Sequence, residues 1–257
     1  RNRDGEYITG VVALKPPHFM SEAERKSVPQ VADLSIDVGS SSREETINDY
    51  KIDTGCPIFV DVDCEYNEKT GLFFGKDFDD RFGAAAMADI LENLKDEEVN
   101  FDLVAALSSQ EEVGLRGAYV TARKIKPDLC LVLESCPADD TFEPDWLSQT
   151  GLKRGPMLRD MDVTFLPNPK FQQYACDLAD KNGIPYTRSV RTGGGQDGAA
   201  IYYENGAPTI VIGIPVRYEH SPYCFSSYKD YKAAVDLALA IIRDIDEEKL
   251  ESFKSFN

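Results

Sequence analysis

The sequence predicts an α/β protein in which a mostly parallel sheet carries helices on both faces. First, from residue 74 onward, segments with helical periodicity alternate with short apolar runs. Second, several of these runs are almost continuously apolar, as in strands that are buried on both faces. Third, the chain has 257 residues, of which 42% are hydrophobic and 28% charged, as in an ordinary globular protein.

Residues 1–73 have a different pattern. Short β-branched segments at 7–12, 34–39 and 57–62 are separated by glycine, proline and aspartate, which indicates a small β-rich unit. Residues 42–47 begin with a serine followed by glutamates, which predicts one short helix. We therefore expect two domains, residues 1–73 and residues 74–257.

In the second domain, each element follows from its own pattern. Apolar residues recur on one helical face or run without interruption, and capping residues mark the ends. The expected helices are residues 79–94, 171–179 with Gly183 just beyond, a short helix from a cap at Asp197 to before Gly206, and 231–245. The expected strands are residues 101–107, 129–133, 184–190 and 209–214.

The chain is strongly acidic, with 45 acidic and 28 basic residues and a net charge of −17. Such a charge repels phosphate backbones and anionic lipids, so we expect neither a nucleic acid nor a membrane as partner. No apolar run reaches the roughly 20 residues that cross a bilayer. The six cysteines include no Cys-x-x-Cys pair, which favours free thiols in a cytoplasmic protein.

Acidic residues and a histidine follow the predicted strands or precede the first helix of the second domain. Ligands of open α/β sheets bind beyond the carboxyl ends of strands, so these side chains are expected to share one rim. They are Asp79, Asp80, Glu111, Glu112, Glu134 and His220. With only two histidines in the chain, a metal site would be mostly carboxylate.

Carboxylates that converge on one rim repel each other unless protons, basic groups or divalent cations intervene. Asp, Glu and His are the ligand set of zinc or cobalt hydrolytic sites, in which two ions sometimes share a bridging carboxylate. In an adjacent Glu-Glu pair, one carboxylate can bind metal while the other takes a proton from the attacking water.

Each motif also has a simpler interpretation. Glu111-Glu112 could be a solvated surface pair, Asp79-Asp80 could cap a helix, and His220 could be an ordinary loop histidine. Each of these alternatives suits its motif taken alone. The shared location at the strand ends favours a functional site.

Several segments resemble the tetrahedral dinuclear metalloaminopeptidases, the family that includes glutamyl and deblocking aminopeptidases. They occur in the family's order through nearly the whole chain, and the strings at 110–118 and 214–222 are the most specific. They are Lys-Pro-Pro-His at 15–18, Ile-Asp-Val-Gly-Ser at 36–40, Asp-Asp-Arg-Phe-Gly at 79–83, Gln-Glu-Glu-Val-Gly-Leu-Arg-Gly-Ala at 110–118, Gly-Gly-Gln-Asp at 194–197, and Ile-Pro-Val-Arg-Tyr-Glu-His-Ser-Pro at 214–222.

The resemblance implies a role for each candidate. Asp79 bridges two divalent ions, Glu112 and His220 complete one ion's ligands, and Glu134 is the acidic ligand of the other. Glu111 is the general base and acid that helps water remove one residue from a peptide's N-terminus. Zinc, cobalt and manganese all suit such a site. Asp80, Asp197 and Arg217 contact the metal ligands without binding the metal, or line the substrate pocket.

The resemblance also implies an architecture. A three-layer α/β catalytic domain is interrupted by a small barrel-like dimerisation domain, of which residues 1–73 match the later part. The dimers assemble into a tetrahedral dodecamer, and the substrates are short peptides.

The chain departs from the family's pattern in two places. It has no His-x-Asp motif, which carries the family's first metal ligand, and His18 matches a different position. The usual Gly-Gly-Thr-Asp is Gly-Gly-Gln-Asp here. Because the chain begins at Arg1 without methionine, we expect it to be the larger C-terminal part of such an enzyme.

Two other functions stay open at this point. A short homologue without catalysis could serve as an assembly or binding subunit. A glycosidase could use paired carboxylates without metal. Arg188, Arg191 and Arg217 near the rim could favour an acidic N-terminal residue of the substrate, or could be ordinary surface charges.

Overall fold

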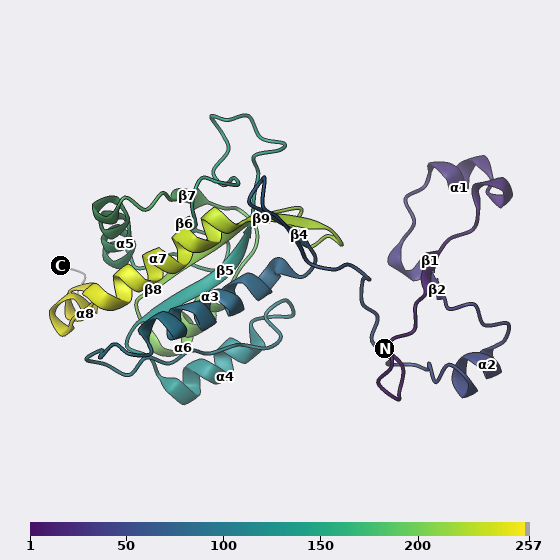
Figure 1. Ribbon diagram of the computed structural model, residues 1–257, viewed down its shortest axis with the longest axis horizontal. Helices are drawn as coiled ribbons and strands as arrows, with labels where there is room; N and C mark the ends of the chain where they lie inside the picture. The colour runs from purple at the N-terminus through teal and green to yellow at the C-terminus, as the bar shows by residue number, and fades with distance from the viewer. Residues whose placement is uncertain (255–257) are drawn as a thin grey trace. The chain divides into compact units, whose positions relative to one another are not determined.

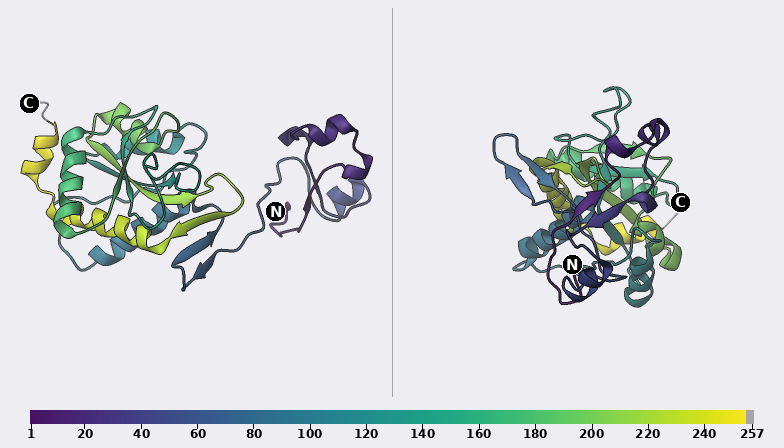
Figure 2. Two further views of the ribbon diagram at one scale, coloured as in Figure 1. Left: turned by 90° about the horizontal axis from the view of Figure 1, so that it is seen from above. Right: turned by 90° about the vertical axis from the view of Figure 1, so that its right-hand side faces the viewer.

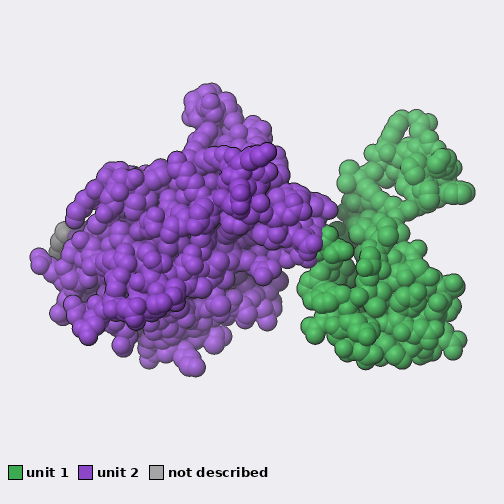
Figure 3. Space-filling model, viewed as in Figure 1, with its two compact units in different colours: residues 1–61 green, residues 62–257 purple. Residues whose placement is uncertain are grey.

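The computed structural model describes residues 1–254, and the chain forms two compact units (Figure 3). Unit 1 covers residues 1–61 and unit 2 residues 62–257. This division precedes the expected boundary after residue 73 because strands at 65–67 and 72–75 belong to the sheet of unit 2. Within residues 1–254, no helix has the length and apolar character needed to span a bilayer.

Unit 1 contains a two-stranded antiparallel ribbon of β1 (Val11–Ala13) and β2 (Ser35–Asp37). Two short α-helices, α1 (Glu22–Lys26) and α2 (Arg43–Asn48), and the 3₁₀ turns η1 (Pro17–Phe19) and η2 (Val31–Asp33) complete it. The predicted helix near 42–47 is confirmed, and the Ser42 hydroxyl caps it by accepting from Glu45 N–H. Residues 57–62 form no strand. The barrel and its part in dimerisation stay predictions.

Unit 2 is built on a seven-stranded mixed sheet. The strand order is β3 (Glu65–Asn67), β4 (Leu72–Gly75), β9 (Cys224–Ser227), β8 (Thr209–Arg217), β6 (Met157–Met161) and β7 (Thr187–Val190), and β5 (Cys130–Pro137) also pairs with β8. The pairs β5–β8 and β6–β7 are parallel, and the other pairs are antiparallel. The α/β class and a mixed sheet are confirmed, but the expected predominance of parallel pairs is wrong, because most pairs are antiparallel.

Helices cover both faces of this sheet (Figures 1 and 2). On one face lie α3 (Phe78–Leu94), α5 (Pro169–Asn182) and α7 (Tyr228–Asp244), and on the other lie α4 (Arg116–Ile125) and α6 (Asp197–Asn205), while α8 (Glu247–Lys254) ends the described chain. Successive residues of β8 point to opposite faces. Ile210 and Ile212 join the core beneath α3, α5 and α7, whereas Val211 packs with Ala199 of α6.

The predicted strand at 101–107 is wrong, because this segment has no regular structure. Val104 is 54% exposed and Leu107 is 72% exposed. A strand requires a hydrogen-bonded neighbour, and among the described residues β5 pairs with β8 alone. An apolar run is therefore not sufficient to form a strand here.

The ends of helices α5 and α6 lie at or next to the residues that the sequence predicted. Gly183 ends α5 and Gly206 ends α6, both with the left-handed backbone expected of a terminating glycine. The expected cap at Asp197 is wrong by one residue: Gln196 caps α6 by accepting from Gly198 N–H. This leaves the carboxylate of Asp197 available for other contacts.

Candidate metal centre

The two aspartates at the start of α3 have non-helical backbone angles, and regular helix follows them. Asp80 accepts from Gly83 N–H at 2.9 Å and from the Ser135 hydroxyl at 3.3 Å, so the capping interpretation is correct for Asp80. A Cβ at Gly83 would lie 2.2 Å from Asp80 Oδ2 and 2.6 Å from the Leu133 carbonyl. Glycine is therefore required where α3 packs against β5.

Glu111 and Glu112 lie in a tight loop directly before α4. Gly114 and Leu115 donate to the Glu111 carbonyl, and Gly117 donates to the Ser109 carbonyl. A Cβ at Gly117 would lie 2.4 Å from the Ser109 backbone, which explains a glycine in this string. These contacts hold both glutamates in a defined loop.

His220 lies in the turn after β8. Its Nε2 is 2.9 Å from Asp79 Oδ2 and 3.3 Å from Glu112 Oε1. Tyr218 and His220 both have positive φ, as does Gln110 beside Glu111. Such conformations cost of order 1–3 kcal/mol each and persist where the surrounding structure enforces them. The backbone therefore holds these turns in a conformation that brings the three side chains together.

Two groups of side chains could each hold a metal ion, and Asp79 belongs to both. One group is Asp79, Glu112 and His220, and the other is Asp79, Asp80 and Glu134. Within each group, the ligand atoms lie within 4.8 Å of one another. Oxygen atoms and one imidazole at this spacing, with one carboxylate shared, fit a pair of divalent cations.

Three of the candidate acids have raised pKa values: Asp80, Glu111 and Glu134. Burial raises the pKa of Asp80 to about 6, and Asp79 contributes by repulsion. Burial, followed by the charges of Asp197, Glu112 and Asp79, raises the pKa of Glu111 to about 7. Burial and neighbouring carboxylates also raise the pKa of Glu134 well above its usual range. This mutual repulsion is what a bound cation would relieve.

Two further acids adjoin the cluster. Asp197 accepts from the Ser108 hydroxyl through Oδ2, while its buried Oδ1 has no hydrogen-bond partner within residues 1–254. Glu219 was missed by the sequence reasoning. Its Oε1 is buried and, within the same residues, also without a partner, and burial followed by repulsion from Asp79 raises its pKa to about 8. The signal available for Glu219 was its position next to His220 in the string at 214–222.

The three arginines proposed near the rim all have acidic partners. Arg217 forms two hydrogen bonds with Asp140, at 2.9 and 2.7 Å. Arg191 pairs with Asp139, and Arg188 pairs with Asp160. Their charges are compensated within the chain, which favours the interpretation that they are ordinary surface charges.

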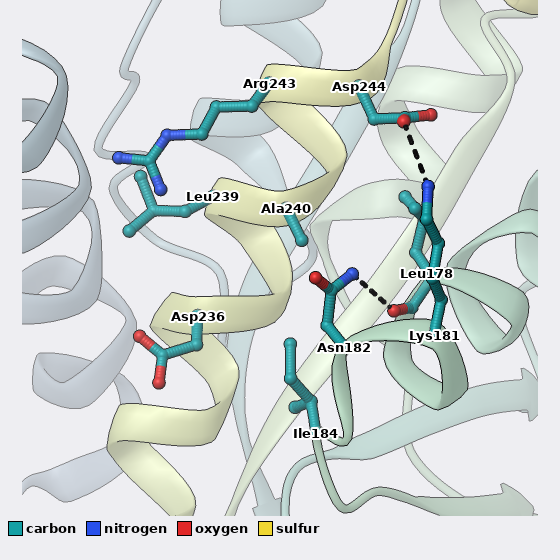
Figure 4. Close-up of a pocket in the computed structure, with 9 residues that line it drawn as sticks. All are labelled: Leu178, Lys181, Asn182, Ile184, Asp236, Leu239, Ala240, Arg243 and Asp244. Atoms are coloured by element: carbon teal, nitrogen blue, oxygen red, sulfur yellow. Dashed lines mark hydrogen bonds and ion pairs between the residues drawn. The ribbon is translucent and has the colours of Figure 1, made fainter.

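Two surface hollows lie away from these carboxylates. One, of about 510 Å³, is bounded by α5 and α7 and is crossed by the ion pair between Lys181 and Asp244 (Figure 4). The other, of about 670 Å³, is lined by residues of the β3–β4 hairpin, the end of α5 and the start of α7. None of the candidate metal ligands lines either hollow.

Comparison with known families decides the relationship of this chain. The model of the M42 glutamyl aminopeptidase family matches residues 1–237. The chain belongs to this family of peptidases. The resemblance of the sequence motifs is thereby confirmed.

Individual relatives agree with this assignment. A glutamyl aminopeptidase from Lactococcus lactis is 29% identical over 99% of the chain and 71% of its own length. An aminopeptidase structure from Desulfurococcus kamchatkensis is 33% identical, covers 99% of the chain and 70% of its own length, and has a TM-score of 0.91. The Pyrococcus horikoshii TET1 peptidase, which assembles into a tetrahedron or an octahedral shell, is 28% identical over 92% of the chain and 68% of its own length, with a TM-score of 0.79.

Proposed function

We propose that the chain acts as a metal-dependent aminopeptidase that removes the N-terminal residue of short peptides. The observation that carries this proposal is the position of Asp79, which is shared by two groups of potential metal ligands close to Glu111. Membership of the M42 family supports peptidase chemistry.

Asp79, Glu112 and His220 would hold one divalent ion, and Asp79 and Glu134 would hold the other. Asp80, which the sequence placed beside the ligands rather than among them, has an oxygen close enough to join this second group. Zinc, cobalt and manganese all suit this donor set. Ions bound there supply Lewis acidity, which makes water nucleophilic and polarises the peptide carbonyl. The fit rests on the spacing of the donors and on Asp80 and Glu134, whose carboxylates form no ion pair with a basic side chain within residues 1–254.

Glu111 is suited to move the proton. Its pKa near 7 allows it to accept a proton from the attacking water and to return that proton to the leaving amine. Asp197 contributes to this pKa by repulsion, and Ser108 holds Asp197 in position. The anionic surroundings also favour the protonated α-amino group of the substrate.

The remaining sequence predictions belong to this proposal. We propose that the chain works as a homo-oligomer, as TET relatives do, with residues 1–73 contributing to dimerisation. The six cysteines are free thiols, which suits the cytoplasmic location predicted from the sequence. Neither nucleic acid nor a membrane is expected as a partner.

The test uses the purified chain and synthetic peptides. Chain supplied with zinc, cobalt or manganese should release single residues from peptides with a free N-terminus, as measured by mass spectrometry. Acetylated peptides and chelated protein serve as controls. Release of internal fragments, or equal activity after chelation, would contradict the proposal. Metal binding without any cleavage would favour a non-catalytic subunit.

A further inference from the structure

The loop between β5 and β6 exposes an aromatic tip, which we call the knob (residues 142–147). Figure 1 shows this loop extending away from the body of unit 2. Phe142 is 72% exposed and Trp146, the sole tryptophan of the chain, is 80% exposed, while Leu147 is 46% exposed. Exposed clusters of large apolar side chains indicate a contact surface.

The knob is held in a defined shape. Phe142 donates to the Asp139 carbonyl, and Leu147 donates to the Pro144 carbonyl. At its base, the buried Asp139 carboxylate accepts hydrogen bonds from the Ser148 hydroxyl, the backbone of Gln149 and Thr150, and Arg191. A partner would therefore find the aromatic side chains on an ordered loop, which lowers the entropic cost of binding.

The hollow of about 670 Å³ on unit 2 has the complementary character, and we call it the basic hollow. Tyr66 and Tyr228, which are each about half exposed, and three lysines line it. These lysines are Lys153, Lys229 and Lys232. Within residues 1–254, Lys153 and Lys229 have no carboxylate at ion-pair distance. Lys232 forms an ion pair with Asp236, with Nζ 3.5 Å from Oδ1.

The charges of the two surfaces are opposite. The knob carries Glu143 and Asp145, and the side chain of Asp145 is 98% exposed although it pairs weakly with Arg154 at 3.4 Å. A chain with a net charge of −17 repels its own copies, so a basic region on one side favours a contact between copies. Lysine ammonium groups also bind the faces of tryptophan and tyrosine rings.

We propose that the knob of one copy docks into the basic hollow of a second copy. This contact rests on the homo-oligomer proposed above and identifies two surfaces through which its copies would bind each other. Trp146 is exposed in its own chain, so the knob does not fill its own hollow. Because the knob and the hollow are different surfaces, each copy can give one contact and receive another, and more than two copies can be linked.

Tryptophan fluorescence tests this contact, because Trp146 alone reports on the knob. As concentration rises and larger species form in sedimentation velocity, the emission should shift to shorter wavelength. Trp146→Ala should raise the concentration of half-assembly by about tenfold or more. Tyr203→Ala removes an aromatic residue that is 68% exposed on α6 and should leave assembly unchanged.

Charge exchange identifies the partner surface. Glu143→Lys with Asp145→Lys, or Lys229→Glu with Lys232→Glu, should each weaken assembly, and the four changes together should restore it. Failure of that rescue would overturn the proposal, as would long-wavelength Trp146 emission in fully assembled protein. An emission shift caused by peptide, without any change in assembly, would instead assign the knob to the substrate. Peptidase activity is measured separately, so the proposed function can fail or stand independently.

Discussion

Strands β8 and β1 have similar apolar residues but different environments. In β8, every residue from Thr209 to Val216 is buried, because strands lie along both edges and helices cover both faces. In β1, Val11 and Val12 are 67% and 62% exposed, because β2 is its single neighbour among the described residues. A two-stranded ribbon is marginally stable alone. Burial therefore depends on the neighbours and not on the strand's own sequence.

The acidic residues of the two units differ in the same way. In unit 1, Glu24 and Glu45 stabilise the starts of α1 and α2. Their carboxylates accept hydrogen bonds from the backbone N–H groups of Ser21 and Ser41. In unit 2, carboxylates from α3, β5 and the loop before α4 form two adjacent groups that share Asp79. Net charge does not distinguish these cases. The two cases differ in whether separate elements bring their carboxylates together, and the following experiments test this difference between the units.

The largest effect is expected at Glu111. Glu111→Gln removes the group that transfers the proton and should lower kcat by about 10²–10⁴-fold while metal binding is retained. The measurement is peptide turnover together with metal analysis. Glu44→Gln, in the exposed first turn of α2 of unit 1, is the control and should be neutral. Normal turnover in Glu111→Gln would remove Glu111 from the mechanism.

The next largest difference between the units is expected in the loss of stability when an isoleucine is shortened to alanine. Ile212→Ala, at a fully buried position of β8, should lower the free energy of unfolding by about 2–5 kcal/mol. Ile36→Ala in β2, where the side chain is 37% exposed, should cost about 1 kcal/mol or less. Denaturant unfolding monitored by circular dichroism measures both. Equal losses would mean that unit 1 has a core of its own.

His220→Ala tests the metal assignment. Loss of the imidazole should remove one ion per chain, because Asp79 and Glu112 alone remain from that group. Elemental analysis after dialysis measures the stoichiometry. His18→Ala, at η1 of unit 1, should leave the metal content unchanged. An unchanged metal content in His220→Ala would refute the assignment.

The smallest effect is expected at Leu107, the end of the segment that was expected to be a strand. Leu107→Lys should change the free energy of unfolding by no more than about 0.5 kcal/mol, because the side chain is 72% exposed. Thermal unfolding provides the measurement. A large loss of stability would show that this apolar segment is buried against another strand.

Much of the local structure could be predicted. Helices α3, α5 and α7 and strand β8 follow from periodicity and apolar runs, and Gly183 and Gly206 mark two helix ends. The errors occur where a distant partner decides. The antiparallel strands β4 and β9 are short and depend on pairing with each other and with β3 and β8, so neither is evident in its own sequence. Residues 101–107 show the reverse, since they have a strand-like pattern but no partner.

For the candidate site, the sequence by itself determined the inventory and the family: which acids and which histidine follow the strands, and the motif strings that place the chain in the M42 family. Only the tertiary structure decided which of them meet. It brings Asp79 next to both His220 and Glu134, compensates Arg217 with Asp140, and adds Glu219, whose Oε1 is buried. The physical reason is that Coulomb energy, burial and ligand spacing depend on distances between residues far apart in the chain, which no local pattern contains.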